Sequence, residues 1–288
     1  MNVLITGSSG FIGNNIYHYF KKKRIKLIGI DKKKNKYNNI KNFLKIDLSN
    51  YEKLEKALKR QKFNKIIHLA ALPGFDACEK NPDRAIKDNV ITTLNLLEII
   101  KKRKIKFIFV SSVGVKNFEK NKSAYAFTKK ICENLVLAYV KNFGVNASIV
   151  RLSNVFGKYS LHKKSVIHGF IKNSLDKRFL KIHDSGNQLR DFIDAESVSR
   201  SFLKILFKKK NKLIIEICSG QYTSVNNLKI LINKISGKKN NFKHIVAPAG
   251  YDTNVYKKNK SSSYKKNNFF YNKLIETYKW YTNNYNIK

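Results

Sequence analysis

A glycine-rich turn near the start of the chain is the first feature with evident chemistry. Residues 7–13 read G-x-x-G-x-x-G, after an apolar run at 3–6 and at the opening of an amphipathic run at 11–22. Glycines at this spacing allow a tight strand-to-helix turn and let the backbone approach a pyrophosphate at the positive end of the helix. The pattern predicts a dinucleotide site. Its predicted contacts in the turn are Gly7, Gly10, Phe11, Ile12 and Gly13.

An acidic residue ends the second predicted strand, at 27–30. Asp31 lies 18 residues after Gly13, where a carboxylate accepts hydrogen bonds from the adenosine ribose hydroxyls and repels a 2′-phosphate. We therefore expect NAD as the cofactor. Three lysines at 32–34 could pair with a 2′-phosphate, so NADP is the less favoured alternative. A glycine-rich turn beside an ordinary surface aspartate is the non-functional interpretation.

A tyrosine and a lysine four residues apart form a second candidate site. Tyr125 and Lys129 open a predicted helix at 125–141, downstream of a predicted strand that leads into Ser112. Residues at i and i+4 share one helix face, so both side chains can reach the same pocket. The spacing also occurs at five other tyrosines of this lysine-rich chain. Position, more than spacing, therefore distinguishes this pair from ordinary helix residues.

These residues need a scaffold, and the pattern of the chain predicts one. Apolar strand-like runs alternate with helix-length amphipathic segments through the first 150 residues. Such alternation predicts an α/β fold, a Rossmann-like doubly wound parallel sheet with helices on both faces. The pattern becomes irregular after residue 153, which predicts a smaller C-terminal lobe. The expected strands lie at 3–6, 27–30, 42–46, 66–70, 107–111, 147–152 and 213–218, and the main expected helices at 11–22, 51–60, 82–101 and 125–141.

The charge balance gives no support to a nucleic-acid partner. The formal net charge is +40 at pH 7, but only eight of the 59 basic residues are arginine. The lysines are spread over predicted helix faces and loops, whereas a polyanion surface gathers arginine and aromatic side chains on one face. The charge should still attract anionic small molecules.

Other sequence features favour an intracellular enzyme without metal. No stretch approaches the roughly 18 consecutive apolar residues of a membrane span, and no secretory leader precedes the first strand, so we expect no membrane association. Cys78, Cys132 and Cys218 are scattered and lack metal-ligand spacing. They predict reduced thiols in a cytoplasmic protein and no metal site.

Taken in order, the motifs resemble the extended short-chain dehydrogenase/reductase family, the NAD-dependent nucleotide-sugar epimerases and dehydratases. The resemblance covers residues 1 to about 207 and continues more faintly to the end. It implies an NAD-binding domain at 1–153, with 187–216 returning to it, and a substrate-binding lobe at 154–186 and 217–288. It also implies a homodimer through the helices at 82–101 and 125–141, whose apolar stripes could equally be core.

The resemblance assigns roles to individual residues. It makes Ser112, Tyr125 and Lys129 the catalytic set, and a nucleotide-diphosphate sugar the substrate. A surface salt bridge to a neighbouring aspartate is the alternative role for Arg190, and a helix-surface amide is the alternative for Asn89. The implied cofactor contacts beyond the turn are Asp31, Asp47, Leu48, Leu69, Ala70, Ala71, Asn89, Tyr125 and Lys129, and the implied substrate contacts are Asn154 and Arg190.

The implied chemistry is proton removal coupled to hydride transfer. A phenol with a pKa of about 10 is a poor base at neutral pH, but a nearby ammonium and the positive nicotinamide ring favour its phenolate. We expect Tyr125 to take a proton from a sugar hydroxyl while hydride passes to the nicotinamide. Lys129 would lower the Tyr125 pKa and hold the nicotinamide ribose, and Ser112 would donate a hydrogen bond to the reacting oxygen.

The sequence indicates the reaction that follows this oxidation less directly than it indicates the oxidation itself. Family dehydratases and decarboxylases place acidic residues after the catalytic Ser or Thr, whereas Val113 and Gly114 follow Ser112. We therefore expect epimerisation through a transient keto-sugar, and C4 is the favoured position. The expected role is the synthesis of cell-surface polysaccharide precursors. The alternatives are a nucleotide-sugar reductase or dehydrogenase, a dehydratase, and an NAD-binding regulatory protein without turnover.

Three departures from the family pattern concern the substrate. The gap of 13 residues between Ser112 and Tyr125 is short for the extended members, and Asp194 and Ala195 replace a usual His-Val pair. The family pattern includes a second phosphate-binding arginine in the C-terminal region. No arginine follows Arg200 in this chain, so that residue has no counterpart here. A lysine could serve instead, although as a point charge without the bidentate fork. The candidates are Lys257, Lys258 and Lys260.

Overall fold

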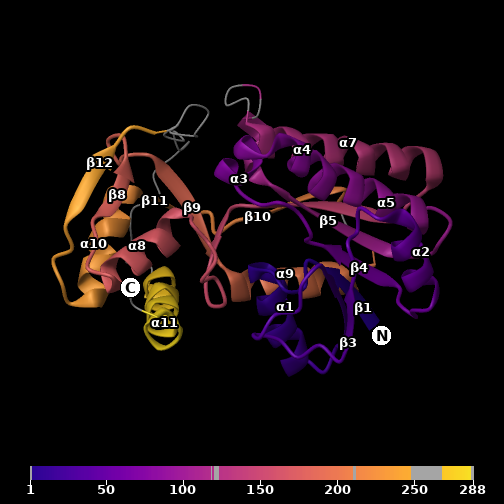
Figure 1. Ribbon diagram of the computed structural model, residues 1–288, viewed down its shortest axis with the longest axis horizontal. Helices are drawn as coiled ribbons and strands as arrows, with labels where there is room; N and C mark the ends of the chain where they lie inside the picture. The colour runs from indigo at the N-terminus through magenta and orange to yellow at the C-terminus, as the bar shows by residue number, and fades with distance from the viewer. Residues whose placement is uncertain (1, 118, 120–122, 210–211, 248–267, 287–288) are drawn as a thin grey trace. The chain divides into compact units, whose positions relative to one another are not determined.

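The computed structural model describes residues 2–117, 119, 123–209, 212–247 and 268–286, and its largest element is a seven-stranded sheet (Figure 1). Every neighbouring pair of its strands is parallel, which confirms the predicted doubly wound α/β fold. Central strands are apolar almost throughout because helices cover both faces. From one edge to the other the strands are β10 (Ile214–Ile217), β6 (Ala147–Leu152), β5 (Lys106–Ser112), β4 (Lys65–His68), β1 (Asn2–Thr6), β2 (Lys26–Asp31) and β3 (Asn42–Lys45).

Helices pack on the two faces of this sheet according to the direction of each crossover. Helices α1 (Phe11–Lys22) and α9 (Ala195–Phe207) lie on one face, and α2 (Tyr51–Lys59), α5 (Thr92–Ile100) and α7 (Ala124–Phe143) lie on the other (Figure 1). The strand order reverses between β1 and β4, since the chain first winds outward to β3 and then returns to β4. A reversal of this kind opens a crevice at the carboxyl ends of the strands, where ligands of open α/β sheets bind.

The segment between β4 and β5 contains a local irregularity. Helix α3 (Phe75–Lys80) comes first, and the helix predicted at 82–101 then forms as α4 (Pro82–Ala85), a π-helical turn η1 (Ile86–Ile91) and α5 without interruption. A π-turn widens the helix by one residue and is frequent at functional sites. Here it leaves the consecutive polar residues Asp88 and Asn89 both buried.

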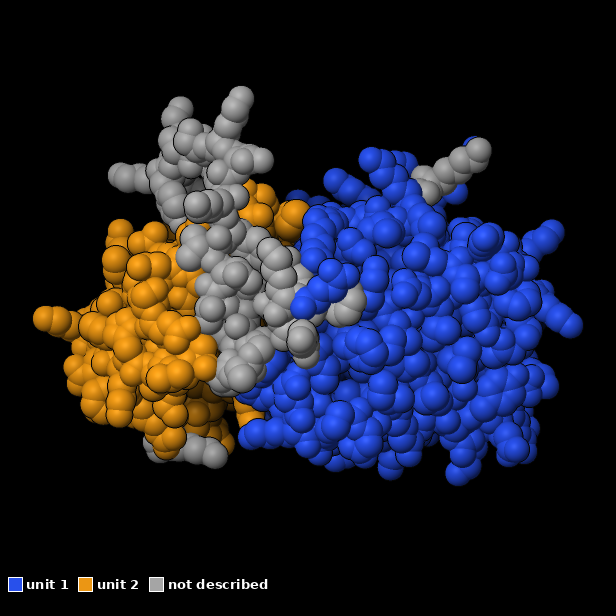
Figure 2. Space-filling model, turned by 90° about the horizontal axis from the view of Figure 1, so that it is seen from above, with its two compact units in different colours: residues 1–152, 199–217 blue, residues 153–198, 218–288 orange. Residues whose placement is uncertain are grey.

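The chain divides into two compact units (Figure 2). Unit 1 comprises residues 1–152 and 199–217 and contains the seven-stranded sheet; unit 2 comprises residues 153–198 and 218–288. The second segment of unit 1 begins at Ser199, later than the expected 187. The reason is that β9 (Leu189–Asp194) pairs with β7 (Asn154–Phe156) and β11 (Tyr222–Ser224), which are strands of unit 2.

Unit 2 has its own core between small sheets and three helices. A two-stranded sheet of β8 (Leu180–His183) and β12 (Phe242–Ile245) accompanies the β11-β9-β7 sheet. Strand β12 forms because it pairs in parallel with β8. The helices are α8 (Val166–Leu175), α10 (Val225–Ser236) and α11 (Asn268–Asn284), and their core includes Phe156, Phe170, Leu228, Leu274 and Tyr281.

Among the residues described, no helix combines the length and apolar character that a membrane crossing requires.

Candidate active site

The glycine turn brings three pieces of backbone into contact. Gly7 adopts a φ of +67°, and a Cβ there would lie 2.7 Å from the backbone nitrogen of Ala70 at the end of β4. A Cβ on Gly13 would lie 2.5 Å from the carbonyl oxygen of Gly7. Neither position can hold a larger residue without moving backbone. The turn, the end of β4 and helix α1 therefore form one close-packed cradle.

The start of α1 offers donors to an anion. Gly10 caps the helix without a side-chain hydrogen bond, and the first turn contains no acidic residue. Phe11 and Ile12 are its first two residues, and N–H groups of a first helical turn point along the axis toward the preceding loop. The Ser9 hydroxyl is buried there without a hydrogen-bond partner among the described residues. This cradle fits a dinucleotide pyrophosphate.

Asp31 lies beside the turn. Its Oδ2 accepts a hydrogen bond of 3.0 Å from the Ser9 N–H, and its Oδ1 accepts one of 3.4 Å from the Lys33 N–H. Burial raises the pKa of Asp31, and these hydrogen bonds oppose the rise. The carboxylate is thus held next to the pyrophosphate cradle, where it can accept hydrogen bonds from a ribose.

Two of the predicted cofactor contacts, Asp47 and Leu48, follow β3. The Asp47 carboxylate accepts hydrogen bonds of 2.9 and 2.8 Å from the backbone and hydroxyl of Ser49, and its other oxygen lies 3.2 Å from Lys32 Nζ. Leu48 is buried, and its carbonyl accepts a hydrogen bond of 2.9 Å from Asn95 Nδ2. Both residues are therefore fixed at the carboxyl end of the sheet.

The end of β4 is tied to β1. The Leu69 N–H donates to the Thr6 carbonyl, and the Ala70 N–H donates to the Thr6 hydroxyl, each at a distance of 3.2 Å. His68 is buried between the hydroxyls of Thr6 and Thr93, at 2.7 and 3.0 Å. Burial lowers the pKa of His68 to about 3, so this imidazole is a neutral packing residue. Leu69, Ala70 and Ala71 follow it at the edge of the glycine cradle.

Asn89 connects the loop after β4 to helix α7. Its Oδ1 accepts a hydrogen bond of 2.6 Å from the Leu72 N–H, and its Nδ2 donates to the Thr128 hydroxyl at 3.0 Å. Both bonds are internal, so Asn89 is a buried link and not a surface amide. Thr128 directly precedes Lys129, so the link fixes α7 against the loop after β4.

The three predicted catalytic residues come from β5 and α7. Ser112 ends β5, and its side chain lies near that of Tyr125, in the first turn of α7. Lys129 lies one turn further on, where its Nζ donates to the Val110 carbonyl at 2.9 Å and lies 5.0 Å from the centre of the Phe109 ring. The structure thus brings Ser112 and Tyr125 into contact and holds Lys129 against the same strand.

The protonation of this group is set mainly by burial. Burial raises the pKa of Tyr125 to about 12, the Cys78 thiol adds to the rise, and the hydrogen bond with Ser112 opposes it. Burial also lowers the pKa of Lys129. Lys129 is not among the groups that shift the Tyr125 pKa here. The expected activation of Tyr125 by Lys129 and by the positive nicotinamide therefore stays a prediction.

Two polar side chains, Cys78 and Glu133, lie near this group and were not among the predicted site residues. Cys78 is buried on α3, donates from Sγ to the Leu72 carbonyl at 3.3 Å, and has a pKa that burial raises to about 11, so it is a neutral thiol. Glu133 follows Lys129 by four residues on α7 and accepts hydrogen bonds from Ser111 and Arg151 behind β5. The helical spacing of Glu133 could have revealed it, whereas the approach of α3 is a tertiary feature.

The predicted substrate contacts belong to unit 2. Asn154 lies on β7 and donates from Nδ2 to the Asp191 carbonyl at 3.1 Å. Arg190 lies on β9 and donates from Nη1 to the Leu189 carbonyl at 3.0 Å. The Asp191 carboxylate accepts hydrogen bonds from Ser153, Ser219 and Gly220. These are the bonds described for it, and none of them is the suggested salt bridge to Arg190. Lys257, Lys258 and Lys260 lie outside the described residues.

Known proteins resemble this chain over most of its length. Residues 3–218 match the model of the NAD dependent epimerase/dehydratase family. A UDP-glucuronate 4-epimerase from Thermodesulfobacterium geofontis is 28% identical over 263 residues, which cover 82% of this chain and 81% of that protein.

Solved structures extend the resemblance to the fold. A UDP-glucuronic acid 4-epimerase from Bacillus cereus, in complex with UDP-glucuronic acid and NAD, is 25% identical, with a TM-score of 0.82 over 98% of this chain and 99% of that one. A UDP-glucose 4-epimerase from Thermotoga maritima shares the fold, with a TM-score of 0.85, 23% identity and coverage of 98% and 99%. The chain belongs to the NAD dependent epimerase/dehydratase family.

Proposed function

We propose that this protein is an NAD-dependent 4-epimerase of a UDP-sugar. The observation that carries the proposal is the contact between Ser112 and Tyr125, with Lys129 one turn further on, at the end of a sheet whose first turn fits a pyrophosphate. The names of the relatives support the 4-position and the UDP group. An NAD-binding protein without turnover has no need to keep this set intact.

Residues of unit 1 would hold the cofactor and handle the proton. The N–H groups at the start of α1 would bind the pyrophosphate, Asp31 the adenosine ribose, and Asp47 and Leu48 the adenine. When bound, NAD would supply the acceptor for a hydride from the sugar carbon and, once reduced, the donor that returns it to the opposite face. Tyr125 would take the proton from the C4 hydroxyl and give it back, while Ser112 donates a hydrogen bond to the same oxygen.

The residues around Ser112 favour epimerisation over dehydration. A dehydratase needs an acid or base for a second proton, and Val113 and Gly114 supply none. Glu79 contacts the start of α7, but its carboxylate accepts a hydrogen bond of 2.5 Å from the Ala124 N–H and so serves as a helix cap.

Finer assignments complete the proposal. Arg190 and Asn154 of unit 2 would bind the nucleotide diphosphate. A homodimer is supported by exposed apolar side chains on the two helices expected at its interface, namely Ile86, Ile91, Phe127 and Phe143. Sedimentation analysis tests this assembly. A cytoplasmic location suits the two buried thiols, Cys78 and Cys132, and a role in making polysaccharide precursors.

The decisive experiment incubates the protein with NAD⁺ and a panel of UDP-, GDP- and dTDP-sugars, and identifies the products by NMR. We expect a UDP-sugar to equilibrate with its C4 epimer. A 4-keto-6-deoxy product would identify a dehydratase, and net NADH formation a dehydrogenase. Measurable NAD⁺ binding without conversion of any sugar would favour the regulatory protein.

A further inference from the structure

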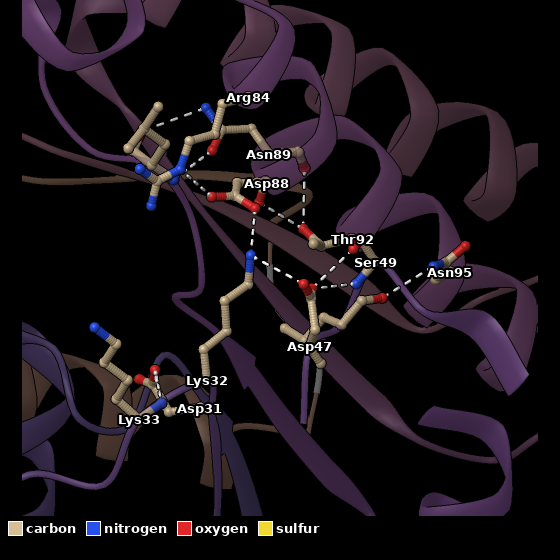
Figure 3. Close-up of polar contacts among 12 residues, drawn as sticks. Asp31, Lys32, Lys33, Asp47, Ser49, Arg84, Asp88, Asn89, Thr92 and Asn95 are labelled. Atoms are coloured by element: carbon tan, nitrogen blue, oxygen red, sulfur yellow. Dashed lines mark hydrogen bonds and ion pairs between the residues drawn. The ribbon is translucent and has the colours of Figure 1, made fainter. Parts of the chain in front are cut away.

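Lys32, Asp47, Arg84 and Asp88 form one connected group of ion pairs (Figure 3). Lys32 comes directly after Asp31, and its Nζ lies 2.6 Å from an oxygen of Asp88 and 3.2 Å from an oxygen of Asp47. Arg84 Nε lies 3.2 Å from the other oxygen of Asp88. The group joins the end of β2, the end of β3 and the π-turn η1. Three segments distant in sequence therefore share one lysine ammonium.

This group differs from an ordinary surface ion pair. The Asp88 side chain is only 10% exposed, and that of Lys32 is 43% exposed. Partial burial acts to lower the pKa of Lys32, but the hydrogen bonds to Asp88 and Asp47 outweigh it and raise that pKa. Two carboxylates therefore hold one ammonium, and Arg84 compensates the second charge. Moving Lys32 away would leave Asp88 partly buried with a weaker set of partners.

The position of Lys32 gives this arrangement a consequence for the cofactor. NADP differs from NAD by the 2′-phosphate on the adenosine ribose, and a cation beside the ribose-binding carboxylate would offset the repulsion of that phosphate. In Figure 3 the Lys32 side chain extends away from its neighbours Asp31 and Lys33 toward Asp47 and Asp88. The lysine best placed along the chain to attract a 2′-phosphate is thus already occupied.

We propose that Asp88, together with Asp47, withholds Lys32 from the ribose and so makes the site select NAD over NADP. This inference rests on the proposed function. Asp47 is also the expected adenine contact, so Asp88 is the carboxylate that remains for Lys32 once a dinucleotide is bound. The side chains of Lys33 and Lys34 are exposed, where salt screens their charges. Asp88 therefore acts on selectivity without touching the cofactor.

The test measures the dissociation constants of NAD⁺ and NADP⁺ by calorimetry for wild type, Asp88→Asn, Lys32→Gln and the double variant. We expect Asp88→Asn to raise the affinity for NADP⁺ relative to NAD⁺ about fivefold, the size of one partly exposed ion pair. Lys32→Gln alone should leave this ratio unchanged, and the double variant should lose the gain. The matched control is Glu55→Gln, which removes the same charge from the exposed Lys59 pair on α2 and should leave the ratio at the wild-type value.

Several results would overturn the inference. These are equal affinity of the wild type for both dinucleotides, an unchanged ratio in Asp88→Asn, a gain that survives in the double variant, and a loss of NADP⁺ affinity in Lys32→Gln. Thermal unfolding checks that Asp88→Asn folds, and Asp88→Ser removes the same charge with a smaller side chain if it does not. Failure of the proposed function would be distinguishable, because the dinucleotide affinities are measured without any sugar, whereas product analysis of the sugar panel reports epimerisation separately.

Discussion

The two units hold their candidate site residues in different ways. In unit 1, Lys129 and Asn89 are buried and bonded to other elements, and Tyr125 contacts Ser112 across the gap from α7 to β5. In unit 2, Asn154 and Arg190 lie on short strands and donate to nearby backbone carbonyls. Unit 1 therefore fixes in one geometry the groups that the proposed reaction requires. Unit 2 offers groups whose replacement should change binding and leave the fold intact.

The strongest test of this contrast is Tyr125→Phe. If Tyr125 moves the proton, kcat for sugar interconversion should fall about 10²- to 10⁴-fold while NAD⁺ still binds. The control is Tyr139→Phe, on the same helix as Tyr125, which removes the hydroxyl that bonds to Glu98 of α5. Steady-state kinetics should show near-normal turnover for the control. A Tyr125→Phe protein with most of its activity would refute the catalytic scheme.

The next largest effect is expected at the glycine turn. Gly7→Ala places a methyl group 2.7 Å from the Ala70 nitrogen at a φ of +67°, so NAD⁺ affinity should fall at least about tenfold. Gly144 is a matched control, with a φ of +65° and nothing within 4 Å of an added Cβ. Gly144→Ala should cost about 1 kcal/mol in unfolding free energy and leave NAD⁺ binding unchanged. Equal effects of the two changes on binding would show that the close approach at Gly7 is unimportant.

A variant in unit 2 should affect a different quantity. Arg190→Lys keeps the charge but loses the guanidinium fork, so KM for the nucleotide sugar should rise about tenfold with little change in kcat. NAD⁺ affinity should stay constant. Arg178→Lys, at an exposed arginine that pairs with the buried carboxylate of Asp176, serves as the control. A fall in kcat with unchanged KM would contradict the assignment of Arg190 to ground-state binding.

The smallest effect concerns pH. The pKa of His68 is about 3 in the folded protein, below its unfolded value, so neutral His68 contributes stability above pH 6.5 that is lost as pH falls from 6.5 toward 3. Between pH 6.5 and 5.5 this loss should approach about 1 kcal/mol. Chemical unfolding of wild type and His68→Asn should show a steeper decline for the wild type. Parallel declines would mean that His68 is not the responsible group.

Much of unit 1 could be predicted from the sequence because its signals are local. The glycine turn lies between one strand and one helix, and apolar runs such as β5 are buried at five consecutive positions. Unit 2 was less accessible to prediction. Strands β7, β9, β11 and β12 have three to six residues each, too few for a clear period, and they exist through pairing with distant segments.

The same division applies to the candidate site. The sequence by itself determined the glycine cradle, the carboxylate of Asp31 and the shared helix face of Tyr125 and Lys129, because backbone sterics and helical spacing act over a few residues. Only the tertiary structure decided that Tyr125 meets Ser112, and that Lys32 is held by Asp88, 56 residues away. A lysine beside Asp31 is ambiguous in sequence, since its effect depends on which carboxylates the fold brings to it.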